Sequence, residues 1–362
     1  MFNIYTNDQP IYTDSDVKHY IYADDTAIAV QHDQFENVEE KLLTTLDILG
    51  KYYRRNYLKP NPSKTQICAF YLRNRCANRI LNVYWNETKI TNTQCPKYLG
   101  ITLDRSLIYR FHCENIKHKI MTRNGILRKL SGSTWGCNPQ VLRTTALALC
   151  FSAGEYASPV WGRSSHTKKV DVALKESCRH ITGCLNNTPV EQLYILSGIA
   201  PLPIRRSTQA DWERMKITAD PRHPMYGITP QLPRLKSRKS SMNHTKAISS
   251  TNPEVERTTR WRNEISSTPS WVPNKSLPSG HNETWPVWRT LNRLRTGIGR
   301  TKDNLIKWGL LDSTDTLRIC GEVQTMQHII TCTACSQTCT PEDIHKGTSQ
   351  GINVARIWAE II

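Results

Sequence analysis

The chain has 362 residues, enough for about two or three domains and a substantial hydrophobic core. Its 48 Lys and Arg against 31 Asp and Glu give a net charge of +17, which predicts attraction to polyanions, nucleic acid first; a basic protein without such a partner is the alternative. No apolar run approaches the ~18 residues of a membrane span, and the N-terminus lacks a secretory signal. We therefore expect an intracellular protein of the cytoplasm or nucleus, with no membrane partner.

The tetrapeptide Tyr22-Ala23-Asp24-Asp25 lies between two short apolar runs, residues 19–21 and 26–30. Both runs are rich in β-branched and aromatic residues, which predicts two strands joined by a tight turn. Adjacent carboxylates at a hairpin tip repel each other and suit divalent cations, because Mg²⁺ prefers carboxylate oxygen. Enzymes that transfer nucleotidyl groups use a pair of such ions. A plain solvated turn is the alternative.

The rest of the first 110 residues predicts a mixed α+β region. Apolar residues recur at helical spacing over residues 35–53, with acids in the first turns and bases near the end, and Pro60 and Pro62 stop this helix. Strands are predicted at residues 65–71, 81–85 and 98–103. The expected layout is a helix packed on an antiparallel sheet.

Residues 111–218 are predicted to be helical, with amphipathic helices at 116–130, 139–150, 170–181 and 189–197. Residues 219–280 are rich in Pro, Ser, Thr, Asn and basic side chains, which predicts a disordered basic linker. Such a linker either follows a phosphate backbone or is a solvated spacer. Helical spacing returns in residues 281–362, starting with Trp285, Trp288 and Leu291.

Four blocks of the first 104 residues form a recognisable series. They are Phe2-Asn3-Ile4-Tyr5-Thr6-Asn7-Asp8, Tyr22-Ala23-Asp24-Asp25, Leu58-Lys59-Pro60-Asn61-Pro62-Ser63-Lys64-Thr65 and Lys97-Tyr98-Leu99-Gly100-Ile101-Thr102-Leu103-Asp104. In order and spacing they resemble the palm domain of reverse transcriptases from non-LTR retrotransposons of the jockey-like kind. The resemblance implies a partial palm at 1–110, a helical thumb and connection at 111–218, the basic linker at 219–280 and a small Cys/His segment at 281–362. It also implies an RNA-directed DNA polymerase, a nucleotidyltransferase that uses an RNA template, a DNA primer, deoxynucleoside triphosphates and Mg²⁺.

The resemblance also implies roles for single residues. Asp24 and Asp25 would hold Mg²⁺, and Lys64 would protonate or neutralise the leaving pyrophosphate. The segment Tyr98, Leu99 and Gly100 would grip the primer end, where glycine allows close backbone approach. From the residues alone, the alternative for Lys64 is an ordinary solvated lysine at the start of a strand, and the alternative for Tyr98 is a core tyrosine. The family's fingers, first catalytic Asp and Gln-Gly segment would lie upstream of Met1, so we expect a fragment that is inactive alone.

A cluster of soft ligands lies near the C-terminus. Cys320, His328, Cys332 and Cys335 are candidate zinc ligands, since His328 and Cys332 are four residues apart on a predicted helix. Related elements carry a further Cys where this sequence has Arg318, and Cys335 is the replacement we expect. Free thiols with a solvent-exposed histidine are the alternative.

Basic residues precede this cluster. Arg293, Arg295 and Arg300 are candidate contacts to nucleic-acid phosphates, in a segment that resembles the one before the Cys/His cluster of the same elements. A solvated basic helix that packs its leucine face is the alternative.

Three functions stay open at this point. The chain is part of a reverse transcriptase, a nucleic-acid-binding remnant without catalysis, or a decayed gene product. The family's first catalytic Asp, which these residues do not include, separates the first function from the other two.

Overall fold

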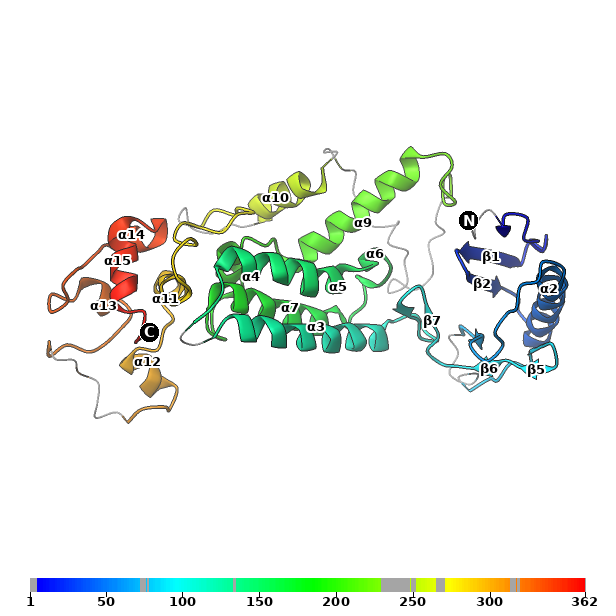
Figure 1. Cartoon of the computed structure of the whole chain (residues 1–362), viewed down its shortest axis with the longest axis horizontal. Helices are drawn as coiled ribbons and strands as arrows, with labels where there is room; N and C mark the ends of the chain where they lie inside the picture. The colour runs from blue at the N-terminus through cyan, green and yellow to red at the C-terminus, as the bar shows by residue number, and fades with distance from the viewer. Residues whose placement is uncertain are drawn as a thin grey trace. The chain divides into compact units, whose positions relative to one another are not determined.

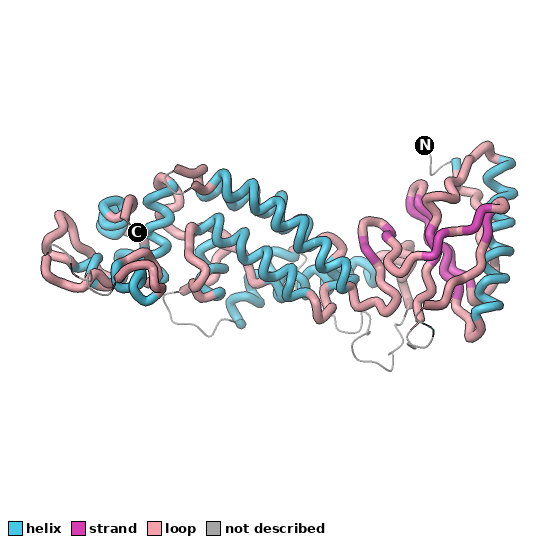
Figure 2. The backbone as a smooth tube through the Cα atoms, turned by 90° about the horizontal axis from the view of Figure 1, so that it is seen from below, coloured by secondary structure: helices cyan, strands magenta, loops and turns pink. Residues whose placement is uncertain are grey.

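The computed structural model describes residues 5–71, 76, 78–132, 135–228, 248, 252–264, 271–312, 317 and 320–361. It combines helices with small sheets, which is compatible with the predicted α+β class. The chain divides into two compact units, Met1–His112 (unit 1) and Cys113–Ile362 (unit 2). Figure 1 labels the elements of both units, and Figure 2 shows the strands of the described residues, all of which belong to unit 1. The predicted boundaries at 218 and 280 stay predictions.

The predicted hairpin is confirmed. Strand β1, Val17–Tyr22, pairs antiparallel with β2, Asp25–Val30, and the last pair of the ladder is Tyr22 with Asp25. Ala23 and Asp24 therefore form a two-residue turn, and Ala23 has a φ of +51°. Tight hairpins need a positive φ at this first turn position, because only such turns match the twist of the strands. Asp24 thus lies at the tip.

The predicted helix after the hairpin is confirmed as α2, Phe35–Arg55. Glu36 lies in its first turn and Arg54 and Arg55 in its last, where each charge complements the helix dipole. Its inner face packs on a small apolar cluster of unit 1. The buried members of this cluster are Leu46, Leu81, Val83, Trp85 and Ile90.

The other strands of unit 1 are shorter than predicted. They are β3 Gln66–Ile67, β4 Tyr84–Trp85, β5 Thr88–Lys89, β6 Thr91–Asn92, β7 Lys97–Tyr98 and β8 Ile101–Thr102. Together with β1 and β2 they make four separate two-stranded sheets in the described residues, and the β3–β6 pair is parallel. The predicted antiparallel pairing is thus confirmed in three of these small sheets, but they do not join into one sheet. Residues 98–103 belong to a hairpin instead of one strand.

A side chain explains part of this difference. The Asn92 amide bonds both the backbone N–H and the backbone carbonyl oxygen of Leu81, each at 2.9 Å. A polar side chain that satisfies backbone groups competes with strand pairing, so the ladder is not extended at Leu81.

Unit 2 is built from helices. They are α3 Arg110–Leu130, α4 Pro139–Ala146, the π-helical turn η2 Leu147–Phe151, α5 Ser152–Glu155, α6 Ser158–Trp161, α7 Thr167–Thr182, α8 Val190–Ser197, α9 Leu202–Ala219, α10 Pro253–Glu264, α11 Trp285–Thr296, α12 Lys302–Lys307, α13 His328–Thr331, α14 Pro341–Lys346 and α15 Ser349–Ile357. The helices predicted between residues 116 and 197 are confirmed. None of the helices described combines the length and the apolar character that a bilayer crossing requires.

Local sequence signals and buried bonds explain these helices. Helix α4 begins where the Asn138 side chain accepts a hydrogen bond from the N–H of Gln140, with Pro139 at the first helical position. Between helices, the Asn124 amide of α3 donates to the carbonyl of Ala173 at 2.8 Å and accepts from Ser177 Oγ at 2.7 Å. Because all three groups are buried, these bonds hold α3 and α7 in one arrangement.

Helix α10 corrects the prediction of a disordered linker for residues 253–264. Trp261 on α10 is only 1% exposed, and α10 packs along α9. Arg260 bonds Asp211 of α9 at 2.5 Å and Glu256 of its own helix at 2.7 Å. The composition of this segment did not indicate a helix, because it has few apolar residues. A buried tryptophan and a network of ion pairs stabilise the helix instead. Residues 229–247, 249–251 and 265–270 of the predicted linker lie outside the described residues.

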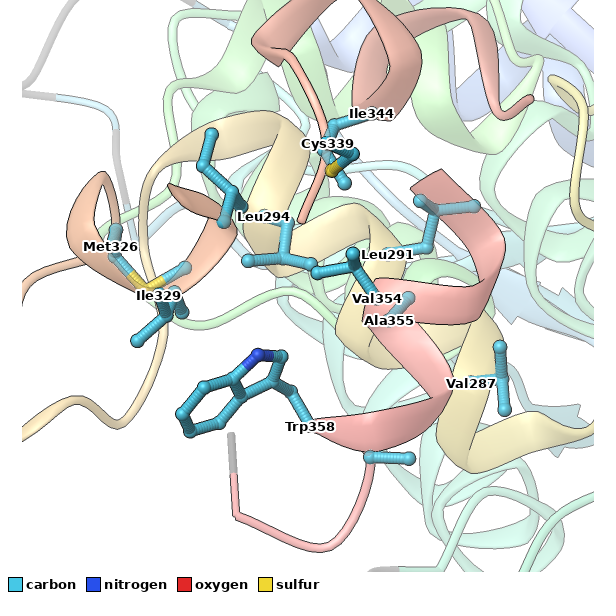
Figure 3. Close-up of a cluster of buried hydrophobic side chains, with 12 residues drawn as sticks. Val287, Leu291, Leu294, Met326, Ile329, Cys339, Ile344, Val354, Ala355 and Trp358 are labelled. Carbon is cyan, nitrogen blue, oxygen red and sulfur yellow. The ribbon is translucent and has the colours of Figure 1, made fainter. Parts of the chain in front are cut away.

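The C-terminal part of unit 2 docks through α11. Trp288 Nε1 donates to the carbonyl of Ile181 at 3.0 Å, and Asn292 Nδ2 donates to that of Thr182 at 2.9 Å. These carbonyls end α7, so α11 satisfies acceptors that a helix C-terminus leaves open. The other face of α11 carries a second apolar cluster, shared with α13, α14 and α15 (Figure 3). Its members include Val287, Leu291, Leu294, Ile329, Ile344, Val354 and Trp358.

Candidate functional site

The two carboxylates of the hairpin tip are exposed. Asp24 and Asp25 form no ion pair with any cation in the described part of the protein. Elsewhere in unit 1, Lys41 contacts both Asp14 and Asp16, at 2.8 and 2.7 Å, and its hydrogen bond lowers the pKa of Asp14. Asp24 and Asp25 are therefore available to an added cation, whereas Asp14 and Asp16 are already paired with Lys41.

One cavity of unit 1 brings the predicted catalytic residues together. It has a volume of about 1160 Å³, and its lining includes Asp24, Asp25, Lys64 and Tyr98. Burial, and then the negative charge of Asp25, raise the pKa of Tyr98, so this carboxylate acts on the phenol electrostatically. Segments more than seventy residues apart in the sequence thus line one cavity.

The same cavity has lysines that the sequence analysis gave no role. Lys59 and Lys97 line it together with Lys64, so three lysines line a cavity that is also lined by the three acids Asp24, Asp25 and Asp33. Lys59 and Lys97 belong to the sequence blocks that carry the family resemblance. Their place in these blocks was the sequence signal that could have identified them. Cations and carboxylates around one hollow suit a ligand that has phosphates and bound metal.

The hairpin β7–β8 has a strained turn. Leu99 and Gly100 are its two central residues, with φ values of +43° and +79°. Glycine adopts this conformation freely, whereas leucine rarely does, so Leu99 stores strain of about 1 kcal/mol or more. Such strain persists where the surrounding structure holds the backbone in one conformation. Here the strained turn directly follows Tyr98, which lines the cavity.

The Cys/His cluster forms with three of its four predicted members. The ligand atoms of Cys320, His328 and Cys332 lie within 4.8 Å of one another, and Cys320 Sγ is 3.3 Å from His328 Nε2. Cys335 is not in this group, although its N–H donates to the Cys332 carbonyl at 3.0 Å. Two thiols and one imidazole are the donor set that zinc prefers, so the residues fit this metal. Arg318 lies outside the described residues.

The structure corrects the predicted role of two arginines. Arg293 and Arg295 are only 8% and 5% exposed, and burial lowers the pKa of each to about 10. Arg293 Nε donates to the carbonyl of Gly183 at 3.0 Å, while Arg295 donates to the carbonyls of Ile344 and Ser279 at 3.1 and 2.7 Å.

These two guanidinium groups therefore fasten α11 to backbone carbonyls within unit 2, instead of facing a phosphate or bulk solvent. Arg300 is exposed, and its contact to nucleic acid stays a prediction.

The chain is similar to several curated proteins. It is 26% identical over 198 residues to "RNA-directed DNA polymerase from mobile element jockey" of Drosophila melanogaster, covering 51% of this chain and 20% of that protein. It is 23% identical over 208 residues to "Retrovirus-related Pol polyprotein from type-1 retrotransposable element R1 3" of Nasonia vitripennis, covering 54% of each. It is 24% identical over 196 residues to "Probable RNA-directed DNA polymerase from transposon X-element" of Drosophila melanogaster, covering 51% of this chain and 20% of that protein.

The matched part of these three relatives is between about a fifth and a half of their own length. No family model matches the chain, and no solved structure does. Over about half of its length, the chain resembles the RNA-directed DNA polymerases of jockey-like non-LTR retrotransposons, the family that its sequence motifs indicated.

Proposed function

We propose that this protein is part of an RNA-directed DNA polymerase of a non-LTR retrotransposon, and that unit 1 carries part of the catalytic palm. The observation that carries the proposal is the cavity lined at once by Asp24, Asp25, Lys64 and Tyr98. Its substrates are an RNA template, a DNA primer and deoxynucleoside triphosphates, as the names of the relatives suggest.

Each residue has a role in this proposal. Asp24 and Asp25 would hold Mg²⁺, which would supply positive charge to the primer hydroxyl and the transferred phosphate. Lys64 donates a proton or a positive charge to the leaving pyrophosphate, since a cation there stabilises developing negative charge. Tyr98 contacts the primer end, held in place by the turn at Leu99 and Gly100.

We propose further that the protein is a poor or inactive polymerase by itself. No third Asp, Glu, His or Cys of the described residues joins Asp24 and Asp25 within 4.8 Å. Two exposed carboxylates suffice for one weakly held Mg²⁺ with several waters, whereas two ions about 4 Å apart need more donors. A nucleic-acid-binding role without catalysis is the second candidate, favoured by this short donor set and by the net charge of +17.

A primer-extension assay tests both parts. The unaltered protein, an Asp24→Ala/Asp25→Ala variant and an Asp33→Ala control are given an RNA template, a DNA primer and Mg²⁺. Asp33 is an exposed acid that lines the same cavity away from the tip. We expect no extension by any of them, with template–primer binding that weakens as salt rises.

The other outcomes are equally informative. Extension by the unaltered protein and the control, but not by the double variant, would refute the inactivity and support the catalytic site. Extension that survives in the double variant would overturn the role of Asp24 and Asp25. No binding to template–primer would contradict both candidate functions.

We also propose that Cys320, His328 and Cys332 bind one zinc ion. Cys332 and Cys335 have the Cys-x₂-Cys spacing of many zinc sites, which makes Cys335 the fourth donor in this proposal. Bound zinc would cross-link the loop that holds Cys320 to helix α13, and so stabilise the C-terminal segment.

A further inference from the structure

A second cavity, in unit 2, is lined mainly by positive charge. It has a volume of about 270 Å³ and lies where α4, α9 and α10 meet. Four cations contribute to its lining, against the single acid Glu254. These cations are Arg143, Arg205, Arg257 and Lys275.

Ion pairs neutralise only part of this charge. Arg205 makes a two-pronged contact with Glu155, and Arg257 contacts Glu254. Arg143 instead donates to the carbonyls of Ser197 and Gly198, at 3.2 and 2.9 Å, which carry no net charge. Four cations and two carboxylates leave an excess of two positive charges around one small cavity.

The charge of Arg205 disfavours the charges of Arg143 and Arg257, whereas Glu155 favours that of Arg205 itself. Burial lowers the pKa of both Arg143 and Arg257, and the nearby charge of Arg205 lowers it further in each case. A folded protein does not keep like charges close together in a cavity without compensation, because the low dielectric strengthens their repulsion. An anion in the cavity would remove that cost.

Two buried hydrogen-bond donors of the lining also lack an acceptor in the described structure. They are Nε of Arg257 and Nε1 of Trp261, whose residues are 8% and 1% exposed. A buried donor without an acceptor destabilises the folded state, and it marks a place where an ion or a water molecule belongs.

We propose that this cavity is a binding site for a phosphate group. A phosphate monoester carries about two negative charges and several strong acceptor oxygens, which match the excess charge and the unpartnered donors. Guanidinium groups also suit phosphate geometry better than they suit a spherical anion. The phosphate is either a small free one or the end of a nucleic-acid strand. The site involves none of the residues of the unit 1 cavity and does not depend on polymerase activity.

The test uses the full-length protein and three probes: inorganic phosphate, a short oligonucleotide with a 5′-phosphate, and the same oligonucleotide with a 5′-hydroxyl. Binding is measured by calorimetry for the unaltered protein and for Lys275→Gln and Trp261→Phe. The control is Arg262→Gln, which removes an exposed charge from α10 outside the cavity. Each site variant should weaken binding about tenfold, the effect of one charge-assisted hydrogen bond, while the control changes it little.

The probes separate the two sources of phosphate. If the site variants weaken the binding of inorganic phosphate more than the control does, the ligand is a small free anion. If they weaken only the binding of the 5′-phosphorylated oligonucleotide, the ligand is the end of a strand. If Lys275→Gln weakens none of the three probes more than Arg262→Gln does, the proposal is wrong. Lys275 is exposed, so this comparison holds even if Trp261→Phe does not fold.

Discussion

The two units differ in how their elements are held together. Unit 1 surrounds a cavity of about 1160 Å³ with residues that include its own cluster members Leu46 and Trp85. Unit 2 encloses most of the large side chains that are fully buried, such as Trp161, Trp288 and Leu174. The predicted catalytic residues lie in unit 1 and line this cavity. The larger of the two described cavities and the larger share of fully buried bulky side chains thus belong to different units.

The largest effect we predict comes from metal at the Cys/His cluster of unit 2, which has no counterpart among the residues that line the cavity of unit 1. The purified protein should contain about one zinc ion, and Cys332→Ser should lower zinc affinity by more than the 10–100-fold that loss of an outer-shell partner costs. The control is Cys339→Ser, because burial raises the pKa of Cys339 to about 11 and keeps it a thiol.

Metal content by mass spectrometry and hydrogen exchange of residues 320–335 measure this effect. Chelation should increase exchange there and leave unit 1 unchanged. Absence of zinc from protein purified without chelators would refute the site, as would equal losses in Cys332→Ser and Cys339→Ser.

A pair of identical truncations tests the packing difference directly. Leu174→Ala should destabilise unit 2 by about 3 kcal/mol, because Leu174 is 1% exposed and its removal leaves a void. Leu46→Ala should cost unit 1 only about 1–2 kcal/mol, since Leu46 already borders a cavity. Urea unfolding followed by hydrogen exchange assigns each change to its unit. Equal costs would mean that unit 1 is as tightly packed as unit 2.

The smallest effect concerns the strained turn of unit 1. Leu99→Gly should stabilise unit 1 by up to about 1 kcal/mol, because glycine accepts the positive φ at no steric cost. Leu99→Ala is the control, since alanine keeps the same strain. The midpoint of urea unfolding of unit 1 measures both variants. A destabilised Leu99→Gly would show that contacts of the leucine side chain outweigh the strain.

Patterns of short range were enough to predict much of this protein. The β-branched and aromatic runs on either side of Asp24, the apolar spacing from Phe35 and the amphipathic spacing over residues 139–150 each act within a few residues. The hairpin, α2 and α4 were therefore predictable. The three-residue core of the Cys/His cluster was also foreseen, because His328 and Cys332 are close in sequence.

Long-range contacts decided the rest. Asn92 bonds Leu81 and thereby limits the sheet of unit 1, and Trp261 with Arg260 turns part of a predicted linker into a helix. Arg293 and Arg295 are basic in the sequence but buried in the structure, since backbone carbonyls up to 110 residues away accept their hydrogen bonds. Local residue pattern determines which segments become helices or hairpins. Only tertiary structure decides which charged side chains remain free to bind a ligand, because that depends on distant partners in the fold.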